Sequence, residues 1–254
     1  MIQERPLPEA EMVNGLIGRK LGMTQVFRED GAVTAVTAVE VGPCYVTQVK
    51  TKAKDGCDAV QLGFDEVKKL NRPAREHLKA TGKLFRHLRD IRITDGASLP
   101  VGTKLDVSLF KAGQLVDVIG TSKGRGHAGL VKRHHFKGGP HTHGQSDRER
   151  RSGSIGSTTT PGRVLKGLRM AGHMGDAQVT VRHMEIVSVD PAKNLLVLQG
   201  AVPGAPKALV LVRQSKKIKR APIAPPVKGG KAAAKSTTKA TPKAPAKAEA
   251  KKAS

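Results

Sequence analysis

The sequence predicts a mainly β protein, an antiparallel β-barrel that is closed or nearly closed, with a small α-containing insertion and a long irregular basic loop extension. Three observations predict this fold. Most apolar residues fall in short β-branched runs separated by Gly, Pro, Asn and Asp, which is typical of antiparallel barrels. Only one stretch has a clear helical pattern, and one long internal stretch has no regular period.

The expected strands follow one another along most of the chain. The clearest, Val33 to Val41, reads VTAVTAVEV and places alternate residues on one face. Asp30-Gly31, just before it, is a favourable hairpin turn. The other expected strands are residues 16–20, 24–27, 45–50, 59–64, 104–110, 115–119, 178–189, 195–199 and 208–212.

One helix and several boundaries complete the prediction. Residues 73–81, PAREHLKAT, form the clearest helical pattern, so we expect an insertion over about residues 66–98. The predicted organisation is an N-terminal extension (1–14), a β-barrel body (15–120 and 176–215, with the insertion inside it), a basic arm (121–175) and a tail (216–254).

The charge of the chain is large and unevenly distributed. The net charge is +24, and a chain with so many like charges calls for a polyanionic partner. The basic arm holds eleven Lys and Arg against two acids, and the tail holds twelve against one. Together these two segments carry +20, so the body is left nearly neutral at +4.

Several classes of protein are disfavoured. The longest apolar runs, such as residues 208–212, have the length of strands, whereas a membrane-spanning helix needs roughly 20 apolar residues. The N-terminus has acids and two prolines and no apolar core, unlike a signal peptide. Cys44 and Cys57 are too few for a disulfide framework, so we expect reduced cysteines in a cytoplasmic protein.

The basic arm combines glycine, Arg, Lys and His without a strand or helix period, apart from a possible short helix over residues 128–133. Loops of this length are uncommon in compact domains and are usually functional or disordered. Glycine permits close backbone approach, and Arg and Lys bind phosphates. Such a segment suits threading between RNA helices. The Lys/Ala/Pro tail should be disordered alone, either as a solubilising tail or as a further RNA contact.

The chain has five Phe, one Tyr and no Trp. Proteins that read RNA sequence stack unpaired bases on aromatic side chains, and this chain has few of them. Binding should therefore depend on phosphate charge and on RNA shape.

Three local motifs suggest other chemistry, and each is incomplete. Residues 124–129, GRGHAG, match a dinucleotide-binding pattern but lack the crossover helix and second strand that such a site needs. His141 and His143 could donate two ligands to zinc, although few further ligands lie near them. Ser154 lacks the glycine spacing of a nucleophile elbow. We therefore expect no catalytic residue and no metal ligand.

Four stretches together resemble the ribosomal protein L3 family of the large subunit. They are GLIGRKLGMTQVF at residues 15–27, DVIGTSKGRGHAGLVKRHHF at 117–136, THG at 142–144 with GSIGSTTTPGRVLKGLRMAGHMG at 153–175, and NLLVLQGAVPGA at 194–205. The stretches occur in the family's order and span about residues 15–212.

The resemblance implies a barrel like that of translation factors, with a smaller inserted region and a loop that reaches toward the peptidyl-transferase centre. It also implies binding near the 3′ end of the large-subunit rRNA and a role early in subunit assembly. By position, it adds Thr142, Gly144, Pro161, Gly162, Met170 and Gly172 to the candidate residues of the arm.

The chain departs from the family at two places. Some bacterial members have glutamines between GSIG and TPG, one of which is methylated, whereas this chain has Ser157, Thr158 and Thr159. Some relatives have Trp near the tip of the arm, where this chain has His134 and Phe136. The resemblance therefore implies neither that amide modification nor stacking by an indole.

The sequence leads to one main hypothesis and two competitors. The main hypothesis is a structural, non-catalytic rRNA-binding protein of the ribosome, with neighbouring ribosomal proteins as partners, no membrane or small-molecule substrate, no cofactor, and Mg²⁺ held by the RNA. The competitors are a metal-assisted nucleic-acid enzyme and a histone-like DNA-compacting protein. The candidate RNA-binding residues are Lys123, Arg125, Lys132, Arg133, His134, His135, Phe136, Lys137, His141, His143, Arg148, Arg150, Arg151, Ser154, Thr160, Arg163, Lys166, Arg169 and His173.

Overall fold

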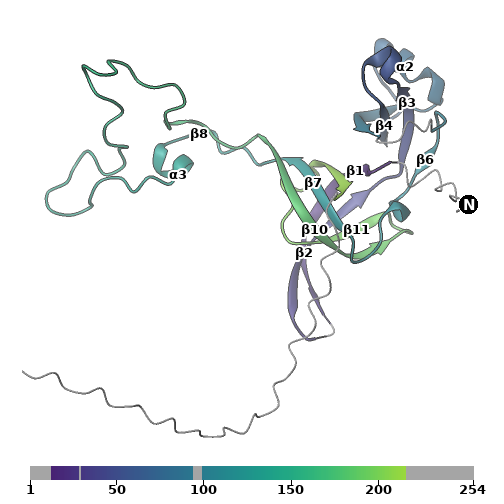
Figure 1. The fold of residues 1–254 in the computed structure, drawn as a ribbon. Coiled ribbons are helices and arrows are strands. Elements are labelled where there is room, and N and C mark those ends of the chain that lie inside the picture. The colour runs from purple at the N-terminus through teal and green to yellow at the C-terminus, as the bar shows by residue number, and fades with distance from the viewer. Residues whose placement is uncertain (1–12, 29, 94–98, 216–254) are drawn as a thin grey trace, which may run out of the picture. The chain divides into compact units, whose positions relative to one another are not determined.

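The computed structural model describes residues 13–28, 30–93 and 99–215 (Figure 1). The predicted tail and nearly all of the predicted N-terminal extension lie outside these residues. Within them, no helix has the length and hydropathy needed to cross a membrane.

Six strands form a closed barrel in the order β1-β12-β7-β10-β11-β2, and every neighbouring pair is antiparallel. This confirms the predicted fold class. Strands β1 and β12 are far apart in the sequence and still pair, which closes the sheet on itself. The strands are β1 (Gly15–Phe27), β2 (Val33–Val41), β7 (Leu115–Thr121), β10 (Gln178–Asp190), β11 (Leu195–Gln199) and β12 (Leu209–Gln214).

Strand β1 is longer than the sequence suggested. Two runs, 16–20 and 24–27, were expected because Gly22 interrupts the apolar pattern, but the chain passes through a β-bulge between Lys20 and Gly22 without leaving the sheet. A hairpin then joins β1 to β2, where Arg28 N–H donates to the carbonyl oxygen of Ala32. The turn predicted at Asp30-Gly31 is thus confirmed.

Four other strands form a second sheet, in the order β5-β4-β3-β6. Their bounds are β3 (Cys44–Lys50), β4 (Ala59–Glu66), β5 (Phe85–Arg92) and β6 (Lys104–Leu105). Residues 45–50 and 59–64 were expected in the barrel, so this sheet extends well beyond the insertion predicted at 66–98. Alternating burial indicates that a strand has one buried face, but not which sheet it joins. The strand expected at 104–110 is short, because a 3₁₀ turn, η3 (Val107–Leu109), follows β6.

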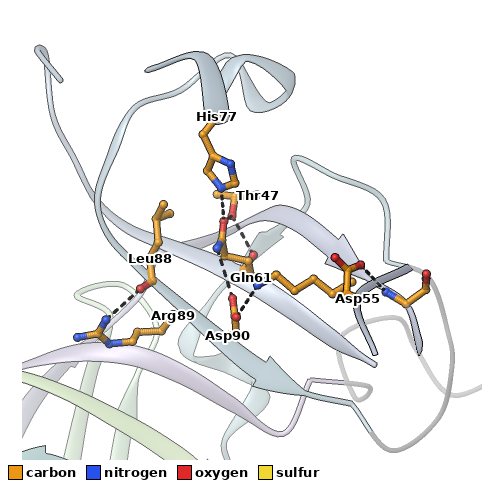
Figure 2. Close-up of polar contacts among 9 residues, drawn as sticks. Thr47, Asp55, Gln61, His77, Leu88, Arg89 and Asp90 are labelled. Atoms are coloured by element: carbon orange, nitrogen blue, oxygen red, sulfur yellow. Dashed lines mark hydrogen bonds and ion pairs between the residues drawn. The ribbon is translucent and has the colours of Figure 1, made fainter. Parts of the chain in front are cut away.

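The helical pattern predicted at 73–81 corresponds to α2 (Arg72–His77) and the 3₁₀ turn η2 (Lys79–Thr81). Another short helix, α1 (Lys52–Asp55), joins β3 to β4. Figure 2 shows how side chains attach α2 to the second sheet: His77 Nε2 lies 2.8 Å from Gln61 Oε1, and Gln61 Nε2 donates to Asp90 at 3.3 Å. Since the Gln61 amide donates to Asp90, its oxygen accepts from His77.

One apolar core is shared by the barrel and the second sheet. Leu16 and Ile17 from β1 and Leu62 from β4 are fully buried members of the same cluster. Burying a side chain of this size stabilises the folded state by roughly 1.5–3 kcal/mol. The two sheets therefore stabilise one another, and they provide the base from which the basic arm leaves the barrel.

Candidate nucleic-acid interface

The basic arm starts as a two-stranded ribbon that continues the ladder of β7 and β10. Ser122 N–H donates to the carbonyl oxygen of Ala177 at 2.9 Å. Arg125 N–H donates to Met174 at 2.8 Å, and Met174 N–H donates to Gly126 at 2.9 Å. The ribbon ends with the short pair β8 (His127–Ala128) and β9 (Gly172–His173). The sequence pattern did not predict this pairing, because it joins residues about 50 positions apart.

A short helix follows the ribbon and contacts the returning half of the arm, residues 153–175. The helix α3 (Leu130–His134) lies where the sequence indicated one. Arg133 Nη1 donates to the carbonyl oxygen of Met170 at 2.9 Å, and His134 Nε2 lies 3.1 Å from the same oxygen. A Cβ atom at Gly172 would lie 2.5 Å from Arg133 Nη1, so glycine leaves room for the guanidinium group. Arg133 and His134 therefore shape the arm as well as charging it.

The backbone comes close to itself a second time in the arm, where residues 138 and 139 meet residue 149. Gly139 N–H donates to the carbonyl oxygen of Glu149 at 2.8 Å, and His141 Nδ1 lies 3.2 Å from Glu149 Oε2. Gly138 has a φ of 78°, and a Cβ atom there would overlap the Glu149 carbonyl oxygen. Only glycine can occupy such a position without moving the backbone.

The returning half of the arm is almost bare of protein contacts. Every residue from 153 to 171 is exposed. Ser154 Oγ donates only to the carbonyl oxygen of Gly156, two residues away, and Leu168 N–H donates to the carbonyl oxygen of Leu165 in a local turn. The stretch also exposes five large apolar side chains, those of Ile155, Val164, Leu165, Leu168 and Met170.

The candidate RNA-binding residues lie on the surface of this arm. Three of them, Arg133, His134 and Phe136, are half-buried. In the described part of the chain, no Lys or Arg of the arm forms an ion pair, and the arm's only contact between a basic side chain and an acid is that of His141 with Glu149. The exposed candidates are Lys123, Arg125, Lys132, His135, Lys137, His141, His143, Arg148, Arg150, Arg151, Ser154, Thr160, Arg163, Lys166, Arg169 and His173.

The arrangement does not match the chemistry that the three local motifs suggested. Residues 124–129 enter an antiparallel ribbon and a helix of five residues, whereas a dinucleotide site needs a parallel βαβ unit. Among the described residues, no three His, Cys, Asp or Glu side chains are grouped as metal ligands would be. Ser154 has its hydroxyl bonded to a backbone oxygen rather than to a base.

One arrangement outside the arm resembles a catalytic triad only in composition. His183 Nδ1 lies 2.8 Å from Ser215 Oγ and 3.9 Å from Asp117 Oδ1. In a working triad the two ring nitrogens of histidine face different partners, so that one accepts the proton of serine while the other is held by the acid. Here the same nitrogen faces both, so the proton relay of a triad is not formed.

A buried lysine connects the barrel to the root of the arm. Lys20 Nζ donates to the carbonyl oxygens of Val202 at 2.7 Å and Gly204 at 3.1 Å. Burial lowers the pKa of Lys20, and the nearby charge of Lys123 lowers it further. Lys20 thus fixes the turn before β12, and the first base of the arm lies close enough to act on it electrostatically.

Sequence reasoning missed a second basic site. Arg19, Arg86, His87 and Lys207 line a cavity of about 370 Å³ together with Leu209. These residues come from β1, β5, β12 and the turn before β12. No local motif signals such a site, because its members are brought together only by the packing of the second sheet against the barrel.

Comparison with known proteins connects this architecture to one family. The family model described as ribosomal protein L3 matches residues 97–195. A large ribosomal subunit protein uL3 from Herpetosiphon aurantiacus is 54% identical over 208 residues, covering 81% of this chain and 98% of the relative. The proteins of the same name from Roseiflexus and Dehalococcoides mccartyi are 57% and 50% identical over 206 residues. These alignments cover 80% and 81% of this chain, and 98% and 100% of the two relatives.

Proposed function

The chain belongs to the ribosomal protein L3 family and is a structural constituent of the large ribosomal subunit, and on this premise we propose that its basic arm binds the large-subunit rRNA. Membership of this family places the protein in the ribosome, in the cytoplasm. The protein would bind near the 3′ end of the rRNA, help to start assembly of the subunit and extend its arm toward the peptidyl-transferase centre.

The observation that carries the proposal is the state of the arm's charges. Its Lys and Arg side chains are exposed, apart from the half-buried Arg133, and none of them has an acidic partner among the described residues. Such charges repel one another unless an external anion neutralises them. The phosphates of folded RNA are a dense source of that anion, and their neutralisation lets RNA helices approach each other.

The root of the arm and its distal part differ in how they are held, which supports different roles for the barrel and the RNA. Hydrogen bonds from Ser122 to Ala177 and from Arg125 to Met174 hold the root in line with β7 and β10. Beyond it, the exposed stretch from 153 to 171 has few contacts of its own. The barrel would thus fix the direction of the arm, and RNA would fix the conformation of its returning half.

The kind of contact follows from the side chains that the arm offers. Phe136 is its only aromatic residue besides histidines, and it is half-buried. Base stacking therefore contributes little, and contacts to phosphate and sugar should dominate. We expect no protein-bound cofactor, with Mg²⁺ ions held by the rRNA, and neighbouring ribosomal proteins as the other partners.

Replacement of residues 127–173 by Asn-Gly tests the proposal. Gly126 and Met174 already face each other in the ribbon, and Asn-Gly closes a two-residue hairpin. Binding to naked large-subunit rRNA is measured against salt concentration. Each lost phosphate contact lowers the salt slope by about 0.7–0.9, so the nine deleted bases account for roughly 6–8 at most. If affinity and slope are both retained, the proposal is wrong.

A charge-matched pair of variants controls for the deletion. Replacing Arg163, Lys166 and Arg169 by Gln removes three arm charges and should lower the salt slope by roughly 2–3. Replacing the exposed Lys52, Lys54 and Lys69 of the body by Gln removes the same charge and should leave the slope unchanged. Equal losses in the two variants would attribute the effect to net charge rather than to the arm.

A further inference from the structure

The basic cavity beside β1 is a second place on this protein where an anion could bind. It encloses about 370 Å³, within the range of roughly 300–1,000 Å³ that is usual for ligand pockets. Arg19 reaches it from β1, Arg86 and His87 from β5, and Lys207 from the turn before β12. None of these residues belongs to the basic arm.

The walls of the cavity are held by contacts of the folded body. Arg19 Nη2 donates to Asp65 Oδ2 at 2.7 Å, and its guanidinium carbon lies 5.9 Å from the centre of the Phe64 ring. Lys207 has a φ of 66°, and its N–H donates to the carbonyl oxygen of Lys20 at 2.7 Å. The guanidinium group of Arg19 and the backbone of Lys207 are thus held by the barrel and the second sheet.

The charge at the cavity is positive and largely unbalanced. Arg86 and Lys207 are exposed and have no ion-pair partner within the residues described. Asp65, whose charge acts on His87, is already engaged by Arg19. Burial lowers the pKa of His87, and the charges of Arg86, Arg19 and Arg89 lower it further against the opposing effect of Asp65. Three arginines thus surround His87 against one carboxylate, so an anion in the cavity would meet mainly positive charge.

The side chains that line the cavity favour an anionic ligand that accepts hydrogen bonds. A guanidinium fork, an ammonium group and an imidazole ring all donate hydrogen bonds, and Arg binds phosphate in bidentate fashion. Leu209 is the only apolar lining residue, and no Phe, Tyr or Trp lines the cavity. The site therefore suits a phosphate group, and apart from the imidazole ring of His87 it has no aromatic side chain on which a base could stack.

We propose that this cavity binds a backbone phosphate of the large-subunit rRNA and gives the protein a second RNA contact separate from the basic arm. The identity of the ligand rests on the proposed function, because only an RNA-binding role makes a phosphodiester the expected anion. Two separate contacts, one on the body and one along the arm, would fix the orientation of the body on the RNA, which a single flexible contact would leave free.

The test uses the full chain with Arg86→Gln and Lys207→Gln combined. Both side chains are exposed, so the variant should keep its fold, which a thermal melt checks. In binding to naked large-subunit rRNA, the salt slope should fall by up to roughly 0.9, the value for one phosphate, because the two bases share that contact. The matched control, Lys111→Gln with Lys193→Gln, removes the same charge from exposed sites elsewhere on the body and should keep the slope.

The outcomes separate this inference from the proposed function of the arm. A cavity variant that binds like the Lys111 and Lys193 control overturns the inference, whatever the arm replacement does. If the cavity variant loses slope while the arm replacement retains affinity and slope, the inference stands and the proposed function of the arm fails.

Inorganic phosphate distinguishes a small-anion site from an RNA contact. The pKa of His87 is followed by NMR while phosphate is added to the full chain. Because Arg86 and Arg19 lower this pKa, a bound anion should raise it, and the double variant should no longer respond to phosphate. A response to free phosphate together with an unchanged RNA salt slope would show that the cavity holds small anions only, and the inference would be wrong.

Discussion

The body and the basic arm of this protein use the same basic residues in opposite ways. In the body, several lysines and arginines are paired with acids from other strands, as in Arg19–Asp65 at 2.7 Å and Lys50–Asp90 at 2.6 Å. In the arm, as far as the structure describes the chain, no Lys or Arg is paired in this way. The body balances much of its own charge, and the arm leaves its charge for a partner.

Apolar residues divide in the same way. Leu62 and Ile17 of the body are completely buried, whereas Leu165 of the arm is 58% exposed. Ordering a residue costs about 1–2 kcal/mol of backbone entropy, which burial of apolar surface must offset. The body meets this cost from its own core, but the returning half of the arm has almost no burial to offset it. The comparison therefore predicts that changes in the body affect stability, whereas changes in the arm affect binding.

The largest expected contrast is between two leucines. Leu62→Ala should lower the free energy of unfolding by about 2–5 kcal/mol, because it leaves a cavity in the core shared by the two sheets. Leu165→Ala should change it by less than about 0.5 kcal/mol, because the side chain is already exposed. Urea unfolding of the free protein measures both, and a similar loss in the two variants would contradict the division.

Two glycines give the next contrast. A Cβ atom at Gly63 would lie 2.5 Å from Cδ2 of Phe85, whose ring stacks on Tyr45 with centroids 5.2 Å apart. Gly63→Ala should therefore overpack the second sheet and cost about 1–3 kcal/mol. A Cβ atom at Gly129, in the arm, would have no other atom within 4 Å, so Gly129→Ala should leave the midpoint of thermal unfolding unchanged. An unaffected Gly63→Ala protein would show that the Phe85 ring can move aside.

The charged network of Figure 2 predicts a smaller effect. Asp90→Asn removes the ion pair with Lys50, which is partly exposed, and should cost about 0.2–1 kcal/mol. The hydrogen bond to Asp90 raises the pKa of Lys50, so this stabilisation is full below pH 10.5 and is lost as the pH rises through the folded-state pKa. Arg150→Gln in the arm should have no effect on unfolding at any pH. A flat difference between the Asp90→Asn and unchanged proteins across alkaline pH would refute this account of Lys50.

His87 predicts the smallest effect, at acidic pH. Its pKa is lowered in the folded state, mainly by burial, so the unfolded chain binds a proton first as the pH falls below about 6.5. Stability should therefore decrease between that value and the folded-state pKa, and His87→Gln should reduce the decrease. His143→Gln in the arm is the control and should not alter it. Urea midpoints at pH 7.5 and pH 5 measure both variants; identical pH dependence with and without His87 would count against the assigned shift.

The barrel was predictable because its strands carry their signal locally. Val33 to Val41 is rich in β-branched residues, and Asp30-Gly31 marks its hairpin, so both could be identified from neighbouring residues alone. The one-sided burial expected over the whole strand is seen only from Thr37 to Val41, because Val33 and Ala35 near the hairpin are exposed. The strand β5, Phe85–Arg92, was missed because its charged residues hide the pattern: only Phe85 and Ile91 are buried. The sequence also did not predict that β3 and β4 belong to the second sheet, because the residues of a strand do not specify which strand it pairs with.

In the candidate site, too, local features could be predicted from the sequence and contacts between distant residues could not. The basic arm could be located from composition alone, because charge and glycine content belong to the residues whatever their conformation. Its root could not, because the pairing of Arg125 with Met174 joins distant positions. Nor could the internal use of Arg133, which contacts Met170 through its guanidinium group.

By itself, the sequence determined that a nearly neutral β body carries a basic segment without a core, since charge, glycine and apolar pattern are properties of the chain alone. Only the tertiary structure decided which strands share a sheet, how the root of the arm is fixed, and that Arg19, Arg86 and Lys207 line one cavity. The physical reason is that pairing and packing depend on contacts between distant residues. Their free energy depends on how the whole chain excludes water from its core, and no local pattern encodes it.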